Sequence, residues 1–237
     1  KQKEKLAGIL HLPKKHAAAG VVLCHGYSSS KDNKESWAEA ICKQGFAVLR
    51  FDFSGHGESA GLLEDLTVTN VVSDLRSALD FLESLKYSKF GVTGHSLGGL
   101  VCAAAASIDK RIGAAAPVSA PSDLSGLFER LEDVIGKNFV DYWKKNKYIY
   151  LYGRKMKYGF YKDAAKYDPA KMLKKITCPL LLIHGDADSI VPVGQAINAF
   201  KLANEPKHLE IIKGADHNFE DRSYEKVIDL TANWFKK

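Results

Sequence analysis

Phe90-Gly91-Val92-Thr93-Gly94-His95-Ser96-Leu97-Gly98-Gly99-Leu100 reads as a short apolar strand, a tight turn and the start of a helix that runs to Ala106. The turn has the pattern Gly-x-Ser-x-Gly, at Gly94, Ser96 and Gly98. A turn this tight forces the serine into strained backbone angles, so the residues two before and two after it must be small. Ser96 would then lie at a helix N-terminus, where unpaired N–H groups favour a developing negative charge. The pattern predicts a nucleophilic serine, and the alternative is a plain glycine-rich turn.

Length and composition fit a single domain over residues 1–237. The chain is 46% hydrophobic and 26% charged, and α/β domains of this size commonly enclose one core. The cysteines lie far apart and form no C-x-x-C pair: Cys24, Cys42, Cys102 and Cys178. We therefore expect buried, reduced thiols and a cytoplasmic protein, rather than a disulfide framework or a zinc site.

Apolar runs and helical patterns alternate along the chain. The expected strands cover residues 5–12, 21–25, 46–51, 90–93, 112–118, 180–184 and 208–212. The expected helices cover residues 33–44, 69–85 and 225–235, besides the one after Ser96. Nearly all-apolar strands that alternate with helices predict an α/β fold with a mostly parallel sheet and helices on both faces. Sites in such folds form beyond the carboxyl ends of the strands, which is where the polar loops fall.

A serine hydroxyl needs a base within hydrogen-bond reach and a third group that orients the base. His217 follows the last strand and is the expected base, against the alternative of an ordinary loop histidine. The acid is Asp186 or Asp188, since both follow the strand over 180–184 and both could reach the imidazole. Three other histidines lie in glycine-rich loops and are expected to have structural roles: His25, His56 and His95.

Several loop motifs are spread along the whole chain: His25-Gly26-Tyr27, Phe51-Asp52-Phe53-Ser54-Gly55-His56-Gly57-Glu58-Ser59, Thr67-Val68-Thr69-Asn70, Gly94-His95-Ser96-Leu97-Gly98-Gly99, His184-Gly185-Asp186-Ala187-Asp188 and Gly214-Ala215-Asp216-His217. With these motifs the chain resembles the α/β-hydrolases and, within that fold, the bacterial cinnamoyl and feruloyl esterases. The resemblance implies the order serine, acid, histidine. It selects Asp188 as the acid, because the family's acid lies three residues before a Val-Pro pair. It also maps the oxyanion hole onto the backbone N–H groups of Tyr27 and Leu97.

The resemblance further implies a helical lid inserted at about residues 122–170, where the alternation of strands and helices breaks down. Residues 137–175 hold twelve basic against three acidic side chains, a balance of +9 in a chain of +6. The same region carries many aromatic residues: Phe139, Tyr142, Trp143, Tyr148, Tyr150, Tyr152, Tyr158, Phe160 and Tyr161. Three explanations compete. The aromatic faces pack on the body while lysines reach solvent; they form a pocket whose basic field favours anionic esters; or the region binds an anionic membrane surface.

We therefore expect a serine carboxylic-ester hydrolase that forms an acyl-enzyme on Ser96, with His217 as base and Asp188 as acid. We expect small esters as substrates, and the resemblance implies hydroxycinnamoyl (feruloyl-type) esters. The alternatives are a monoacylglycerol lipase or serine peptidase of the same fold, and a small-molecule receptor that retains the triad. No metal-ligand spacing, dinucleotide motif or P-loop is present, so we expect no metal and no cofactor. The expected partner is a small-molecule ester, with no nucleic acid and no membrane insertion; a homodimer stays open.

Overall fold

The computed structural model describes residues 5–15, 17, 19–130, 138–220 and 222–236. In these residues a seven-stranded sheet has the order β1-β3-β2-β4-β5-β8-β9. β1 pairs antiparallel with β3 at the edge, and every other neighbouring pair is parallel. The strands are β1 Gly8–His11, β2 Gly20–Cys24, β3 Ala47–Phe51, β4 Phe90–His95, β5 Ile112–Val118, β8 Leu180–Gly185 and β9 Lys207–Ile212. The expected mostly parallel sheet, with an edge strand at the N-terminal end, is confirmed.

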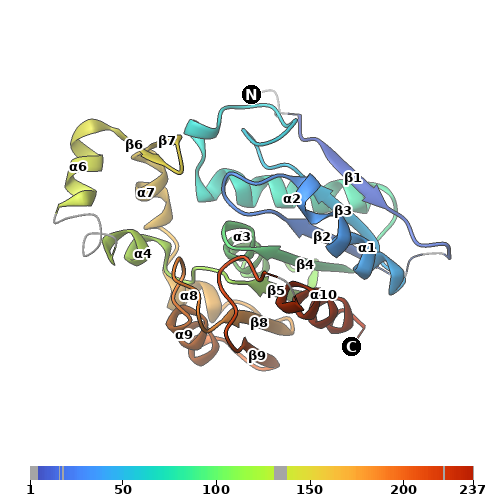
Figure 1. The fold of residues 1–237 in the computed structure, drawn as a ribbon. Helices are drawn as coiled ribbons and strands as arrows, with labels where there is room; N and C mark the ends of the chain where they lie inside the picture. The colour runs from blue at the N-terminus through green and yellow to red at the C-terminus, as the bar shows by residue number, and fades with distance from the viewer. Residues whose placement is uncertain (1–4, 16, 18, 131–137, 221, 237) are drawn as a thin grey trace.

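Helices cover both faces of the sheet (Figure 1). One face packs against α1 (Glu35–Lys43) and α10 (Arg222–Trp234), which contact one another. The other face packs against α2 (Val68–Ser84), α3 (Leu97–Ala106) and α9 (Gly194–Leu202). Each face therefore has its own cluster of buried apolar side chains, as expected for a doubly covered α/β sheet.

The helix expected over residues 33–44 begins differently from the sequence pattern. Lys31–Lys34 form a separate 3₁₀ turn, η1, and α1 follows it without a break. Trp37, near the start of α1, is buried and donates from Nε1 to Oγ1 of Thr231 in α10 at 2.6 Å. This bond joins elements from the two ends of the chain and satisfies an indole N–H that would otherwise be buried without a partner.

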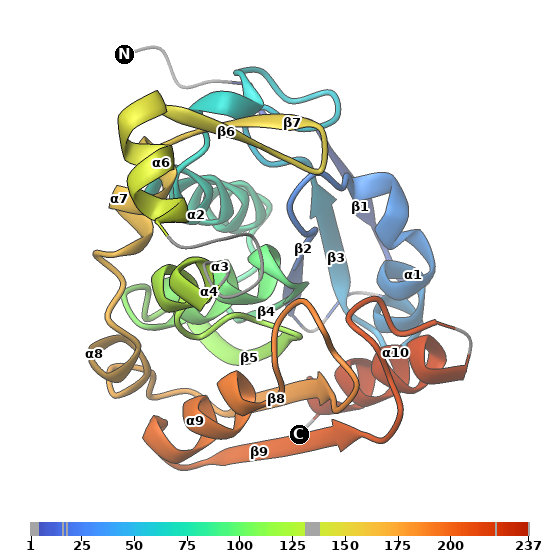
Figure 2. The ribbon, with the colours of Figure 1, turned by 60° about the vertical axis from the view of Figure 1, so that its left-hand side comes forward.

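The insertion, residues 122–170, is not wholly helical, which corrects the expectation of a helical segment. It contains α4 (Leu124–Arg130), α6 (Phe139–Asn146), a hairpin of β6 (Tyr148–Leu151) and β7 (Arg154–Lys157), α7 (Gly159–Ala164) and the start of α8 (Pro169–Leu173). The hairpin turns at Tyr152 and Gly153, whose φ angles are +50° and +70°. Two positive φ values in a two-residue loop match the right-handed twist of the flanking strands. In Figure 2 the hairpin lies above α2, and its turn is drawn near the end of β3.

The aromatic residues of the insertion divide into two groups. Trp143 and Phe160 are buried and make ring contacts with Phe128, and Trp143 also contacts Tyr158 and Tyr161. Another group is exposed: Tyr142, Tyr148, Tyr150 and Tyr152. The buried aromatic rings contact one another and belong to the same cluster of buried apolar side chains as α2 and α3, so the insertion extends the core of that face of the sheet.

Polar contacts fasten the insertion to the body. The carboxylate of Asp163, in α7, accepts hydrogen bonds from the N–H of Thr69 at 2.7 Å and from its hydroxyl at 2.9 Å. Lys157, in β7, lies 2.6 Å from Asp65. The Asp163 side chain is buried. Its contact with Thr69 places the insertion over the N-terminus of α2, where a carboxylate is favoured.

The cysteines are all free thiols: Cys24 and Cys102 are buried, whereas Cys42 and Cys178 are half-buried. No disulfide therefore holds this fold together, and its stability rests on the two apolar clusters. Among the described helices, none combines the length and the apolar character that a bilayer crossing requires.

Candidate active site

Ser96 lies at the turn between β4 and α3, with a φ angle of +56°. Its neighbours hold it there. A Cβ atom at Gly94 would lie 2.8 Å from the carbonyl oxygen of Cys24, and one at Gly98 only 2.6 Å from the same atom. The Ser96 N–H donates to the Val118 carbonyl at 2.9 Å. The small residues on each side thus let β2, β4 and α3 approach closely while Ser96 keeps a strained backbone.

The structure brings Ser96, His217 and Asp188 together. Nε2 of His217 lies 3.0 Å from Oγ of Ser96, and Nδ1 lies 2.7 Å from Oδ2 of Asp188. A carboxylate only accepts, so Nδ1 carries the proton in the neutral imidazole and Nε2 is left to accept from the serine hydroxyl. His217 is 7% exposed, which shields this chain of hydrogen bonds from water. The arrangement can remove a proton from Ser96.

Asp188 is held as a carboxylate. Burial alone would raise its pKa, but hydrogen bonds from His184, from His217 and from the Val191 N–H outweigh burial and bring the pKa well below the usual range. The other carboxylate oxygen accepts from the N–H groups of Ile190 and Val191 at 2.9 and 2.7 Å. The acid therefore stays charged and oriented at every pH at which such a site would work.

The structure separates the two candidate acids. Asp186 accepts from the Gly214 N–H at 2.6 Å, so it fixes the loop that leads to His217. Asp188, two residues later, reaches the imidazole itself. Both side chains follow β8, and only the Asp188 carboxylate contacts His217.

The expected oxyanion donors lie on either side of Ser96. Leu97 is the first residue of α3, and Tyr27 follows β2 and lines the same cavity as Ser96. Neither N–H donates to a backbone carbonyl within the described chain. The Tyr27 hydroxyl is buried, and its burial raises the pKa of the phenol. The N–H groups of these two residues remain the expected donors to a tetrahedral oxyanion.

Two of the loop histidines support the site without entering the triad geometry. His25 donates from Nδ1 to the Gly26 carbonyl at 2.7 Å and accepts from the Phe53 N–H at Nε2, at 3.0 Å. His95 donates from Nε2 to the carbonyl of His217 at 2.7 Å. Burial lowers the pKa of each to about 3, so both imidazoles stay neutral. The bond from His95 fixes the backbone of His217, a positioning contact that the sequence did not predict.

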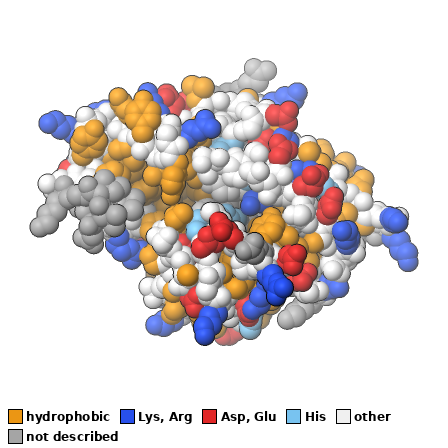
Figure 3. Space-filling view, viewed as in Figure 1, with side chains coloured by type: hydrophobic (Ala, Val, Ile, Leu, Met, Phe, Trp, Pro, Cys, Tyr) orange, Lys and Arg blue, Asp and Glu red, His pale blue; other side chains and the backbone are white. Residues whose placement is uncertain are grey.

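A cavity of about 450 Å³ opens beside Ser96 and His217. It lies between the loop after β2, η1, the start of α1 and the start of α10, and Tyr152 of the hairpin also lines it. Figure 3 shows a hollow in the middle of the face that is turned toward the viewer. Histidine atoms lie at its bottom, with Lys or Arg atoms beside them. This volume is large enough for a small organic ligand.

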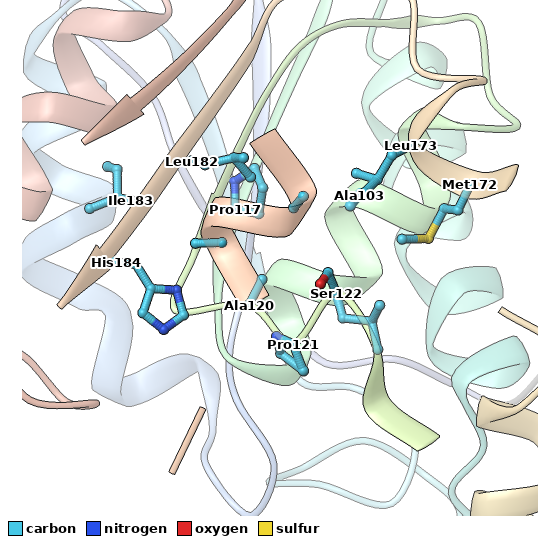
Figure 4. Close-up of a pocket in the computed structure, with 13 residues that line it drawn as sticks. Ala103, Pro117, Ala120, Pro121, Ser122, Met172, Leu173, Leu182, Ile183 and His184 are labelled. Atoms are coloured by element: carbon cyan, nitrogen blue, oxygen red, sulfur yellow. The ribbon is translucent and has the colours of Figure 1, made fainter. Parts of the chain in front are cut away.

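A second cavity, of about 20 Å³, is lined by residues of α3, β5, α8, β8 and α9 and of the loop after β5 (Figure 4). Its lining is mostly apolar and includes Pro117, Met172, Leu173 and Leu182, with His184 at one side. Such a volume holds about one water-sized molecule, so this cavity is too small for an ester substrate. In the part of the chain that the structure describes, no three His, Cys, Asp or Glu side chains are grouped so that they could hold a metal ion.

Residues 21–148 match the family described as the alpha/beta hydrolase fold. The chain is 30% identical to the mitochondrial palmitoyl-protein thioesterase ABHD10 of Rattus norvegicus, over 85% of this chain and 70% of the rat protein. It is 25% identical to the thermostable monoacylglycerol lipase of Bacillus sp. (strain H-257), over 92% of this chain and 90% of that protein. The solved structure of Est1E from Butyrivibrio proteoclasticus with ferulic acid bound has a TM-score of 0.85 and 25% identity, and covers 100% of this chain and 98% of that one. The resemblance expected from the motifs is confirmed, and the chain belongs to the α/β-hydrolase fold family.

Proposed function

We propose that this hydrolase is a serine carboxylic-ester hydrolase with Ser96 as nucleophile, His217 as general base and Asp188 as the acid that orients the base. The observation that carries the proposal is the 3.0 Å contact between Ser96 Oγ and His217 Nε2, on a serine with a strained, positive φ. A strained backbone at a serine and an oriented imidazole beside its hydroxyl are features of a nucleophile and not of an ordinary loop serine.

In the acylation step, Ser96 Oγ attacks the ester carbonyl while His217 Nε2 takes the hydroxyl proton. The imidazolium that forms is stabilised by the Asp188 carboxylate, which lies 2.7 Å from Nδ1. The N–H groups of Tyr27 and Leu97 donate to the tetrahedral oxyanion. Collapse of this intermediate breaks the bond to the alcohol, which leaves with the proton from His217, and an acyl-Ser96 ester remains.

In the deacylation step, His217 takes a proton from a water molecule, and the hydroxide attacks the acyl-Ser96 carbonyl. The same two N–H groups donate to the second oxyanion. The bond to Oγ breaks, the acid product leaves, and Ser96 recovers its proton from His217. No step needs a metal or a cofactor, because the base, the acid and the oxyanion donors all come from this chain.

We propose small or hydroxycinnamoyl esters as substrates, with the insertion as a lid. Est1E, similar over the whole chain, has been solved with ferulic acid bound. The cavity beside Ser96 is lined by flat apolar side chains that suit a planar acid or alcohol: Trp37, Tyr152, Phe219 and Tyr224. Tyr152 belongs to the insertion, which supports a role for the insertion in covering bound substrate.

Hydrolysis of acyl thioesters is the second candidate. The similarity to the rat palmitoyl-protein thioesterase, at 30% identity, favours it. The steps are the same as for an ester, except that a thiol leaves in place of an alcohol. The two candidates differ in the acyl group that the protein must accommodate, a long flexible chain or a short planar one.

Steady-state hydrolysis tests both candidates with one panel: methyl ferulate, 4-nitrophenyl esters of increasing chain length, a monoacylglycerol and palmitoyl-coenzyme A. We expect multiple turnover of 4-nitrophenyl butyrate by the wild type, with a burst of nitrophenolate, and loss of turnover in Ser96→Ala. The ratio of kcat/KM among the panel members assigns the acyl preference. If the wild type binds these esters and turns none of them over, the hydrolase proposal is wrong and a receptor role replaces it.

A further inference from the structure

Two lysines of η1 have opposite surroundings. Lys31 is 4% exposed, and its ammonium lies 3.0 Å from Asp52 and 2.6 Å from Glu58. Lys34, one turn later, is 8% exposed. No carboxylate among the described residues forms an ion pair with it, and its Nζ lies 5.7 Å from the centroid of the Trp37 ring. A buried ammonium without a counter-charge is costly, so this one calls for an explanation.

The position of Lys34 in its helix adds to the cost. Lys34 is the last residue of η1 and precedes the first turn of α1, and its ammonium has no acceptor that could cap the N–H groups of that turn. The free N–H groups of a helix N-terminus carry partial positive charge, which repels a cation and attracts an anion. The ammonium and the helix end therefore disfavour one another unless a negative group lies between or beside them.

Lys34 is among the residues that line the cavity containing Ser96 and His217. None of the described residues that line this cavity is Asp or Glu, so Lys34 gives it a net positive charge. Burial lowers the pKa of Lys34 to about 8, which leaves the ammonium mostly protonated at neutral pH. Polar groups beside it can complete an anion site: Ser28, Ser29, Asn33 and Tyr224 all line the same cavity.

We propose that the cavity beside Ser96 binds a carboxylate carried by the ester substrate, with Lys34 Nζ as the cation that pairs with it. The inference rests on the proposed ester hydrolysis and narrows its substrate class to small esters with a free carboxylate on one branch. A single ammonium balances one charge, which favours a carboxylate over a phosphate dianion. The substrate then supplies the negative group that the protein itself does not place there.

Two pairs of substrates that differ by one charge test this inference. Chlorogenate and its methyl ester place the charge on the alcohol branch, and mono-4-nitrophenyl adipate and its methyl ester place it on the acyl branch. For each pair, the ratio of kcat/KM for the charged over the neutral member is measured in the wild type and in Lys34→Met. We expect a preference for the charged member of one pair, reduced about tenfold or more in Lys34→Met, as for the loss of one charge-assisted hydrogen bond.

Matched variants make the result specific. Lys34→Gln is a second neutral replacement, and Lys43→Met, at the exposed end of α1, removes the same charge outside the cavity and should leave both ratios unchanged. An unchanged ratio for both pairs in Lys34→Met and Lys34→Gln overturns the inference. A second result would also overturn the inference: inorganic phosphate inhibits the turnover of a neutral ester at concentrations at which hexanoate has no effect.

Failure of this inference is distinguishable from failure of the proposed function. If neutral esters are turned over in a Ser96-dependent way while the ratios stay unmoved, ester hydrolysis stands and the role of Lys34 is wrong. If the wild type turns over no ester, calorimetry on Ser96→Ala still decides about Lys34. Tighter binding of chlorogenate than of its methyl ester, lost when Lys34→Met is added, supports the carboxylate site, and equal binding of the two overturns it.

Discussion

Nε2 of His184 lies 3.2 Å from Oδ2 of Asp188, the same carboxylate oxygen that Nδ1 of His217 meets at 2.7 Å. His184 also donates from Nε2 to the Val191 carbonyl, at 2.7 Å, and is 1% exposed. Two imidazoles thus contact the same carboxylate oxygen. His184, in β8, also holds the loop between β8 and Val191 through its bond to the Val191 carbonyl. His184 is a positioning residue, because it acts through Asp188 and touches neither Ser96 nor the cavity beside it.

We expect His184→Phe to lower kcat/KM about tenfold, as for loss of a hydrogen bond to a charged group. Without the His184 donor, the pKa of Asp188 rises toward its ordinary value, so its carboxylate attracts the proton shared with His217 more strongly. The acid limb of the pH profile of kcat/KM should therefore move to higher pH. His208→Phe, on the exposed side of β9, is the matched control and should leave the profile in place. A lower activity with an unmoved profile would reduce His184 to a packing role.

Asp188→Asn and Asp186→Asn separate the two acids that the sequence presents side by side. In Asp188→Asn the amide can donate to His217 Nδ1 and stabilise the wrong tautomer, so kcat should fall on the order of 10³- to 10⁴-fold. In Asp186→Asn the amide oxygen still accepts from Gly214, and kcat should stay within about twofold of the wild type. Single-turnover acylation by 4-nitrophenyl butyrate measures both. Equal losses in the two variants would contradict the assignment of Asp188.

Gly98→Ala tests the close packing that strains Ser96. The new Cβ would lie 2.6 Å from the carbonyl oxygens of both Cys24 and His25, and backbone atoms cannot move aside cheaply. We expect a loss of about 3 kcal/mol in the free energy of unfolding, measured by urea denaturation. Gly113→Ala, whose Cβ would meet only the Phe90 carbonyl at 3.7 Å, should change it by less than about 1 kcal/mol. If both variants unfold at the wild-type urea concentration, the turn is not held by this contact.

The strands and the site serine could be predicted because their signals are local. The sheet follows from apolar runs of the right length, and Ser96 follows from the small residues at Gly94 and Gly98, where the backbones meet. The acid could not be selected from local pattern alone. Asp186 and Asp188 follow the same strand, and what distinguishes them is which one faces Gly214 and which faces His217, a property of the folded loop. The resemblance supplied that choice.

Neither the hairpin nor the burial of Lys34 follows from the sequence alone, and the reasons differ. Tyr148 to Leu151 is apolar at every position, so the sequence shows no alternation of polar and apolar residues there, and the alternation of exposed and buried side chains appears only in the fold. Lys34 gives no local signal either, because it is one of 34 basic residues and lies in a polar stretch of sequence. Its burial depends on how the 3₁₀ turn places it beside Trp37 in the folded chain, which no local pattern encodes.

The buried ammonium of Lys34 should also lower the free energy of unfolding of the protein without substrate. Its pKa is about 8 in the folded state against 10.5 ordinarily, so between these values the unfolded chain binds more protons and stability rises with pH. Below pH 8 both states are protonated and the full penalty is present. The free energy of unfolding of Lys34→Met should therefore exceed that of the wild type by about 2 to 3 kcal/mol at pH 7. This difference should shrink as the pH rises toward 10.5. Urea denaturation at pH 7 and pH 10 measures the difference, with the exposed Lys43→Met as control. A Met variant less stable than the wild type at pH 7 would mean that the ammonium already has a compensating partner in the free protein, and the cavity would then have no need of a substrate carboxylate.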